Sequence, residues 1–160
     1  MEAGERVLTA RDIDVLYQET DRLYYEVARG CGISESAYWV LYAVLDADEP
    51  RTQAQIAEDH SLSRQTVSSS VRALEQRQLV RLDYAEGSRR DKVVVLTKEG
   101  QDFCVRYVKP AMEAERRAFA SLGKADQQAF VRTARAYADA VDRELGKLRE
   151  EWGNAGGGEA

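Results

Sequence analysis

The sequence has only two cysteines, Cys31 and Cys104, and a single histidine, His60. Two cysteines are too few for a disulfide framework, so a reducing, cytoplasmic setting is expected. Without clustered Cys and His residues the usual zinc patterns are excluded. No apolar run approaches the roughly 20 residues that span a membrane, and the opening MEAGERVLTARD has no apolar stretch for a signal peptide. We expect no metal, no cofactor and no membrane partner.

Enzyme motifs are missing as well. The sequence has no glycine-rich phosphate-binding loop and no Ser/His/Asp order typical of a nucleophilic hydrolase. His60 is better explained as a residue at a helix end than as a general base. The sequence therefore predicts a protein that is not an enzyme.

The charge of the chain is unevenly distributed. The 160 residues are 44% hydrophobic and 32% charged, as in a globular domain, and the net charge is −5. Residues 51–100 carry nine basic and seven acidic side chains, whereas residues 1–50 carry four basic and eleven acidic ones. Exposed charges more than about 10 Å away are largely screened at physiological salt. The acidic total therefore does not exclude a nucleic-acid partner for the middle of the chain.

Capping residues and helical periodicity predict a mainly helical chain. Thr9 and Asp12 predict the start of a first helix that Gly30 and Gly32 end, and Ser34 predicts the start of a second. We predict a mainly α fold with a small β-hairpin wing, in which a winged helix-turn-helix core carries long terminal helices. The predicted regions are N-terminal helices for dimerisation and core support (1–48), the winged lobe (49–97), C-terminal dimerisation helices (98–152) and a disordered tail (153–160).

The central region predicts two short helices followed by a hairpin. Thr52 and Gln55 form a capping box for a helix through Asp59, and after a brief turn Ser63 caps a helix over about 64–77. Strands are expected over 79–84 and 92–96, with the polar loop AEGSRRD between them. This order suits a duplex DNA reader, with a helix for the major groove and a hairpin for a neighbouring groove.

The C-terminal region predicts two long helices. Thr97 caps a helix over about 98–121, which Pro110 should kink near Tyr107. The last helix, about 125–152, has an apolar stripe formed by Phe130, Ala134, Tyr137, Val141, Leu145, Leu148 and Trp152. This stripe is too long for the central lobe to cover, which favours a symmetric homodimer over a purely intramolecular helix pair.

The helix after Ser63 has two distinct faces. Val67, Ser70, Val71 and Leu74 share the face predicted to point inward, and Gln65, Ser68, Ser69 and Arg72 share the opposite one. Small side chains allow the helix to approach base edges, where Gln pairs with adenine and Arg with guanine or phosphate. The alternative is a solvated face. The predicted DNA contacts, with the residues at the helix start and those of the hairpin, are Ser63, Arg64, Gln65, Ser68, Ser69, Arg72, Arg89, Arg90 and Lys92.

The predicted hairpin tip is basic. It carries Ser88, Arg89 and Arg90, with Lys92 close behind. Arginines on a narrow projecting loop suit the negative potential of a minor groove. The alternative is a charged tip that only keeps the hairpin soluble.

Three motifs in order, TQAQIAE, LSRQTVSSSVRALEQRQLV and SRRDKVVVLTKEG, resemble the MarR family of winged helix-turn-helix transcriptional regulators. The resemblance covers nearly the whole chain. It implies a homodimer whose recognition helices enter major grooves of a pseudo-palindromic operator while the wings reach minor grooves. By position, Thr66, Ser68 and Ser69 lie where the family's recognition helix meets DNA, and Arg90 lies where its wing arginine usually sits.

The sequence departs from the family pattern at three positions. Ser69 stands where an arginine is common, so the charged contact of that arginine with DNA is expected to be absent. Ser88 replaces a common aspartate, which predicts a less well oriented Arg90. Gln78 replaces a usual glycine, which predicts a less sharply turned helix end.

The resemblance also implies a small aromatic effector that releases the DNA, bound between the dimer region and the DNA-binding lobe. Tyr24, Tyr38 and Tyr42 are the candidate pocket residues, although aromatic residues at helical spacing are more often core. Two alternatives remain: a regulator that responds to oxidation of Cys31, and a winged-helix protein-interaction module with little DNA affinity. Cys104 is expected to be buried and inert. The operator, the regulated genes, the effector and the sign of regulation do not follow from the sequence.

Overall fold

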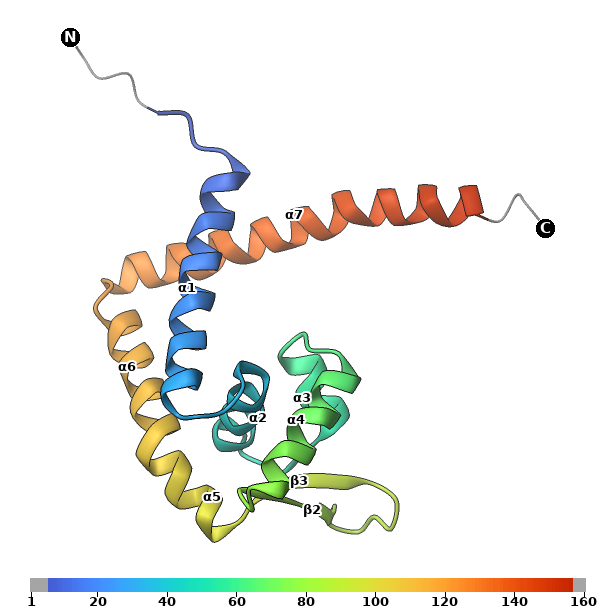
Figure 1. Cartoon of the computed structure of the whole chain (residues 1–160). Coiled ribbons are helices and arrows are strands. Elements are labelled where there is room, and N and C mark those ends of the chain that lie inside the picture. Colours follow the sequence, from blue (N-terminus) through green and yellow to red (C-terminus); the bar gives the residue numbers. More distant parts are fainter. Residues whose placement is uncertain (1–5, 157–160) are drawn as a thin grey trace. The chain divides into compact units, whose positions relative to one another are not determined.

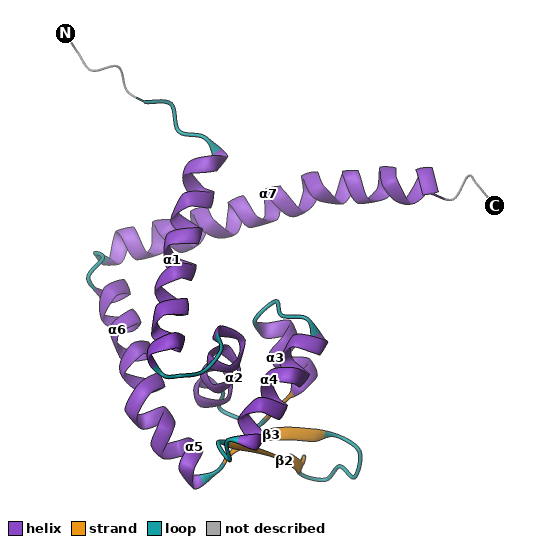
Figure 2. Cartoon of the chain, in the orientation of Figure 1, coloured by secondary structure: helices purple, strands orange, loops and turns teal. Residues whose placement is uncertain are grey.

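The chain is mainly helical with one small antiparallel sheet, which confirms the predicted fold class (Figures 1 and 2). The computed structural model describes residues 6–156. It divides into two compact units, Met1–Glu113 and Ala114–Ala160, whose boundary falls inside one helix. In chain order the elements are α1 (Ala10–Gly30), α2 (Glu35–Asp46), β1 (Arg51–Thr52), α3 (Gln53–Asp59), α4 (Arg64–Gln76), β2 (Val80–Tyr84), β3 (Lys92–Leu96), α5 (Lys98–Phe103), a π-helical segment (Cys104–Val108), α6 (Lys109–Ala120) and α7 (Lys124–Gly156).

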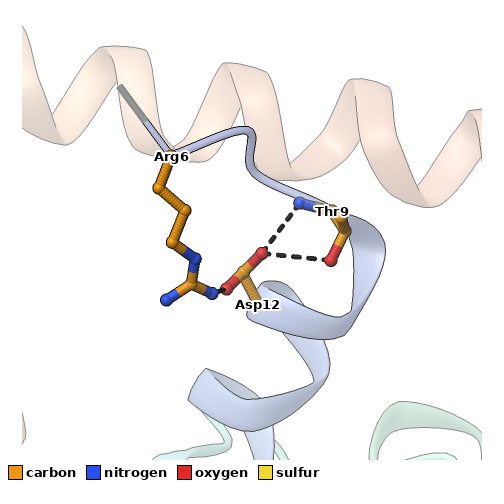
Figure 3. Close-up of polar contacts among 3 residues, drawn as sticks. All are labelled: Arg6, Thr9 and Asp12. Atoms are coloured by element: carbon orange, nitrogen blue, oxygen red, sulfur yellow. Dashed lines mark hydrogen bonds and ion pairs between the residues drawn. The ribbon is translucent and has the colours of Figure 1, made fainter. Parts of the chain in front are cut away.

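The first helix begins at the predicted capping box. The Asp12 carboxylate accepts hydrogen bonds from the Thr9 backbone N–H at 2.8 Å and the Thr9 hydroxyl at 3.1 Å. Figure 3 shows the same carboxylate facing the Arg6 guanidinium, with which it forms an ion pair. A carboxylate in the first turn also interacts favourably with the positive end of the helix dipole. Local chemistry therefore defines this helix start, as the sequence predicts.

The core of the first unit lies between helix α2, helix α4 and the sheet. Ser34 caps α2 by accepting a hydrogen bond from the Ala37 N–H at 3.2 Å. The residues of this core that are almost fully shielded from solvent include Tyr38, Val40, Leu41, Ile56, Val67, Val71, Leu74, Val94, Cys104 and Val108. Burial of this apolar surface is the main source of stability for the lobe, and it gives the exposed elements a rigid support.

The sheet has three strands in the order β1-β3-β2, and both pairings are antiparallel. Val80 pairs with Leu96 and Leu82 with Val94, so these four side chains share the face that packs on the core. The strand β1 contains only two residues, and Arg51 pairs with Val94. The strand β1 is not predicted from the sequence, because two residues show no periodicity.

The helix that contains Pro110 is interrupted just before the proline. A regular α5 ends at Phe103, and the next five residues form a π-helical segment in which the Lys109 N–H bonds to the Cys104 carbonyl. Pro110 has no N–H, so the i→i−4 ladder cannot pass through it. The predicted kink near Tyr107 is thus realised as a π-helical turn, a feature that commonly accommodates an interrupted ladder.

The last helix, α7, is longer than predicted. It continues to Gly156, four residues past the predicted end at Trp152, while residues 157–160 of the predicted disordered tail lie outside the described residues. Several members of its apolar stripe are exposed, including Phe130 (62%), Leu145 (51%) and Trp152 (67%). Among the described residues, no helix combines the length and apolar character that crossing a bilayer requires.

The sharp end of α4 is made by a residue other than glycine. Gln78 has φ 58°, in the left-handed region that glycine adopts easily. The expectation of a less sharply turned helix end is therefore wrong: Gln78 takes the turn that a glycine would take. Its backbone is held there by the Thr97 hydroxyl, which donates to the Gln78 carbonyl at 2.5 Å.

We expect Gln78→Gly to raise the free energy of unfolding by about 0.5–1 kcal/mol. The left-handed conformation costs a residue with a Cβ about 1–2 kcal/mol, which exceeds the roughly 0.5–1 kcal/mol of backbone entropy that glycine loses on folding. Urea unfolding measures the difference. Glu75→Gly, one residue inside the last residue of α4, is the control and should lower stability by about 1 kcal/mol. A similar loss in both variants would contradict the assignment of strain to Gln78.

Candidate nucleic-acid interface

Helices α3 and α4 form a helix-turn-helix with almost no spare residues between them. Thr52 caps α3: its N–H donates to Gln55 Oε1 at 2.8 Å, and its hydroxyl accepts from the Gln55 N–H at 3.2 Å. The turn contains Ser61, which has φ 51°. Ser63 then caps α4 by accepting a hydrogen bond from the Thr66 N–H at 3.0 Å. Capping at both starts fixes where each helix begins, and therefore which side chains α4 presents.

The two predicted faces of α4 are separated in the structure. The inward face is buried at all four predicted positions, Val67, Ser70, Val71 and Leu74. The opposite face, which we call the reading face, consists of Gln65, Ser68, Ser69 and Arg72, and all four residues are exposed. Arg64 is exposed beside it, and Thr66 is half-buried. The structure thus brings a polar face with small central residues onto a helix that the core holds from behind.

The three consecutive serines of α4 have three different environments. Ser70 is buried and donates to Ser36 Oγ at 2.8 Å, a link from α4 to the start of α2. Ser69 donates back to the Thr66 carbonyl at 2.9 Å. Ser68 lies exposed on the reading face. Close approach to DNA can therefore explain at most Ser68 and Ser69, because Ser70 serves packing between helices.

The wing tip is organised by Ser88. Its hydroxyl accepts hydrogen bonds from the N–H groups of Arg90 at 3.2 Å and Asp91 at 3.0 Å, and it lies 3.0 Å from Asp91 Oδ2, to which it donates. A serine side chain that accepts from the next two or three N–H groups orders a turn much as an aspartate does. The Ser88 hydroxyl therefore orders the backbone at Arg90. The sequence predicts a less well oriented Arg90, because Ser88 replaces a common aspartate.

Ser88→Ala should speed amide hydrogen exchange at Arg90 and Asp91 about fivefold, because it removes a hydrogen-bond acceptor worth about 1 kcal/mol. Ser88→Asp is the matched control, because a carboxylate can accept from the same two N–H groups. Exchange measured by NMR at residues 89–91 compares the variants. Equal exchange in the wild type and Ser88→Ala would show that the hydroxyl does not order the tip.

The basic residues of the wing are exposed but differ in their contacts with neighbouring side chains. Arg89 and Arg90 are exposed at the tip. The Lys92 ammonium lies 5.6 Å from the centre of the Tyr84 ring, a cation–π contact. Arg81, further back, forms an ion pair with Asp83 at 3.1 Å. Arg89 and Arg90 therefore place two exposed guanidinium groups at the tip, between the carboxylates of Glu86 and Asp91.

The hairpin also borders an open cleft of about 560 Å³. Its lining residues are Glu49, Pro50, Asp83, Tyr84, Ala85, Glu86, Val93 and Val95. Asp83 pairs with Val93, and this pair faces away from the core side of the sheet. The cleft contains none of the three predicted pocket tyrosines, and its three carboxylates do not suit an aromatic anion.

The three predicted pocket tyrosines lie together, but in a packed cluster. The Tyr38 ring is fully buried, and its centre lies 6.3 Å from those of Tyr24 and Tyr42. Trp39 lies 4.7 Å from Tyr24 and 5.7 Å from His60, two contacts that the sequence analysis missed. His60 is the residue that caps the end of α3, as predicted. The mutual packing of five rings fits a core cluster that a ligand would have to open.

The surroundings of both cysteines disfavour the reactive thiolate. The Cys31 thiol donates to the Val27 carbonyl at 3.0 Å, and burial raises its pKa. Cys104 is fully buried, and desolvation raises its pKa to about 11. Oxidation proceeds through the thiolate, which raised pKa values make scarce at neutral pH. Within residues 6–156, no group of His, Cys, Asp or Glu side chains is placed to hold a metal ion.

Comparison with known proteins finds a family match in the middle of the chain. Residues 32–92 match the family model described as MarR family. The matched segment contains α2, the helix-turn-helix and the hairpin as far as the first residue of β3. This match spans 61 of the 160 residues, so it assigns that segment to the MarR family. The search of curated proteins finds no match to this sequence.

Solved structures of MarR-family regulators share the fold of this chain. A regulator from Neisseria meningitidis is 20% identical, with 89% of this chain and 99% of that one covered and a TM-score of 0.74. MepR from Staphylococcus aureus, solved as a complex with DNA, is 18% identical, with coverage of 85% and 99% and a TM-score of 0.65. PcaV from Streptomyces coelicolor, in complex with its natural ligand, is 24% identical, with coverage of 86% and 99% and a TM-score of 0.59.

Two of the three expected departures from the MarR-family pattern have other consequences in the structure than the sequence predicts. Gln78 adopts the left-handed backbone conformation of the glycine it replaces. Ser88 orders the wing tip through its hydroxyl. At Ser69, by contrast, the hydroxyl bonds to the helix backbone and no positive charge is present. Of the three departures, Ser69 is the one that changes the chemical groups exposed on the reading face.

Proposed function

We propose that this chain is a transcriptional repressor that binds a pseudo-palindromic duplex as a homodimer and is released by a small aromatic effector. The exposed reading face of α4, held from behind by four buried residues and flanked by an arginine-tipped wing, carries the proposal. A rigid polar helix can enter a major groove about 12 Å wide, and a narrow basic loop can enter the adjacent minor groove. The DNA complex of MepR, which shares the fold, supports this use of the lobe.

The proposed contacts divide into two kinds. Gln65, Ser68 and Arg72 read base edges, because their side chains carry the donors and acceptors that distinguish base pairs. Residues that bind phosphate or line the minor groove fix the register of the protein on the duplex. These positioning contacts come from Ser63, Arg64, Thr66, Ser69, Arg89, Arg90 and Lys92.

Selection of bound sequences from a random duplex pool tests the proposal. We expect enrichment of an inverted repeat whose half-site centres lie about one helical turn, or 10–10.5 base pairs, apart or a multiple of that spacing. Gln65→Ala should relax base preference at one fixed position in each half-site. A pool without enrichment, or with only a single half-site, would contradict the proposed mode of binding.

A second copy of the chain is proposed to cover the exposed apolar stripe of α7. Phe130→Glu with Leu145→Glu should turn a sedimenting dimer into a monomer, because each change places a charge where apolar side chains would be buried. Arg132→Glu, on the polar side of the same helix, is the matched control and should leave the dimer intact. Sedimentation velocity separates the two species. A dimer that survives the double substitution would place the interface elsewhere.

The proposed effector is a small aromatic acid bound at Tyr24, Tyr38 and Tyr42. The ligand complex of PcaV supports a ligand-responsive role for the shared fold. Binding requires the packed rings to separate, so it should change the fluorescence of Trp39, which can be followed alone in a Trp152→Phe background. Aromatic acids that change Trp39 emission should also release the selected duplex.

Two other functions compete with this proposal. Cysteine oxidation is disfavoured, because burial raises the pKa of both thiols. A winged-helix module that binds only protein is consistent with the net charge of −5. Salt dependence separates this last reading from DNA binding, because neutralised phosphates release counterions and a protein-only contact releases none.

A further inference from the structure

The recognition helix α4 has directional links to its surroundings at two points along its axis. At its centre, Ser70 donates to Ser36 Oγ at 2.8 Å. At its end, the Arg77 guanidinium donates to the Gly32 carbonyl at 2.6 Å. The apolar packing between these points is not directional and permits small tilts, whereas hydrogen bonds are angle-dependent. Two separated links define the direction of an axis, which one link cannot do.

Arg77 also joins α4 to a third element. Its guanidinium lies 5.6 Å from the centre of the Phe103 ring, at the last residue of α5. One side chain therefore connects the end of α4, the loop between α1 and α2, and α5. Gly32 adopts φ 69°, a conformation that favours glycine, at the position whose carbonyl accepts this bond. The loop that follows α1 and the last residue of α5 thus both contact the end of α4 through the Arg77 guanidinium.

We propose that Arg77 is a positioning residue that sets the direction of α4, and with it the spacing at which two copies read their half-sites. This inference rests on the proposed DNA-binding function. With Ser70 as the pivot, Gln65 lies five residues away, or about 7.5 Å along the helix. A tilt of about 10° would then move Gln65 by roughly 1.3 Å, enough to spoil hydrogen-bond geometry. Arg77 is itself exposed, and its role is orientation of the reading face rather than contact with a base.

The test compares two duplexes for each full-length variant: the duplex recovered by selection, and the same duplex with one base pair inserted between its half-sites. The wild type should bind the insertion about tenfold more weakly. Arg77→Gln should reduce this ratio to about threefold or less while keeping the same base preference within each half-site. Arg77→Lys, which can still donate to Gly32 but has no planar group for Phe103, should fall between them. Arg81→Gln removes the same charge from the same lobe and should keep the wild-type ratio.

An Arg77→Gln variant that keeps the wild-type spacing ratio would overturn the inference, even if its melting temperature fell. If the wild type binds no duplex, the proposed function fails, and amide hydrogen exchange decides the role of Arg77 without DNA. Arg77→Gln should then speed exchange at residues 32–33 and in the last turn of α4 about tenfold, with no change at the start of α4 near Ser63. Unchanged exchange at both segments would show that Arg77 does not position the helix.

Discussion

Gly100→Ala is expected to lower the free energy of unfolding by about 3 kcal/mol, because there is no room for a side chain at this position. A Cβ at residue 100 would lie 2.8 Å from the Leu79 carbonyl carbon and even closer to its oxygen. Both are backbone atoms, which cannot move aside like the end of a flexible side chain. The same Leu79 carbonyl accepts a hydrogen bond from the Thr97 N–H at 3.1 Å, so displacing it would also break this link.

Gly30→Ala is the matched control for Gly100→Ala. Gly30 is the last residue of α1, and a Cβ there would meet nothing within 4 Å. Alanine is the better helix former, so Gly30→Ala should be neutral or stabilise by up to about 1 kcal/mol. Denaturant unfolding followed by circular dichroism compares both variants with the wild type. Similar stability in the two variants would mean that the backbone where α4, β2 and α5 meet can shift to make room for a Cβ at residue 100.

Arg90→Ala should weaken binding to every duplex about tenfold at low salt and make the salt dependence shallower by about one unit of slope. The reason is that Arg90 is exposed at the wing tip, on a backbone that Ser88 holds in place. A minor-groove or phosphate contact adds affinity without naming a base, so base preference should stay unchanged. Fluorescence anisotropy at several salt concentrations measures both the affinity and the slope.

Arg81→Ala is the control for Arg90→Ala, because it removes the same charge from the same hairpin. Arg81 is an exposed residue of β2 that forms an ion pair with Asp83. Its loss should change duplex affinity by less than about threefold, since exposed ion pairs contribute little. If both variants weaken binding equally, the effect is one of total charge and the wing tip has no special role.

The parts of this fold that local chemistry determines could be predicted from the sequence. Thr9, Ser34, Thr52, Ser63 and Thr97 each begin a helix, because a side-chain cap acts over three or four residues and is visible in the sequence. The buried and exposed faces of α4 also follow from spacing alone. These features place the candidate site, because they decide where α4 starts and which residues it exposes.

The features that depend on distant partners could not be predicted in the same way. The strand β1 exists only because Arg51 and Thr52 meet β3, more than 40 residues later. The buried hydroxyl of Ser70 has its reason in Ser36, on another helix. The same limit applies to the ring cluster around Tyr38 and to the link from Arg77 to Gly32. Periodicity and caps can be recognised in a short stretch of sequence, whereas these contacts join residues that only the tertiary structure brings together.

Titration of the selected duplex with the full-length chain, across a range of salt concentrations, tests the central claim most directly. Two chains that each place a recognition helix and a wing on DNA should give two chains per duplex. The logarithm of the binding constant should then fall against the logarithm of salt concentration with a slope of about −5 or steeper. A stoichiometry of one chain, a slope near zero or no binding at about 50 mM salt would contradict the account.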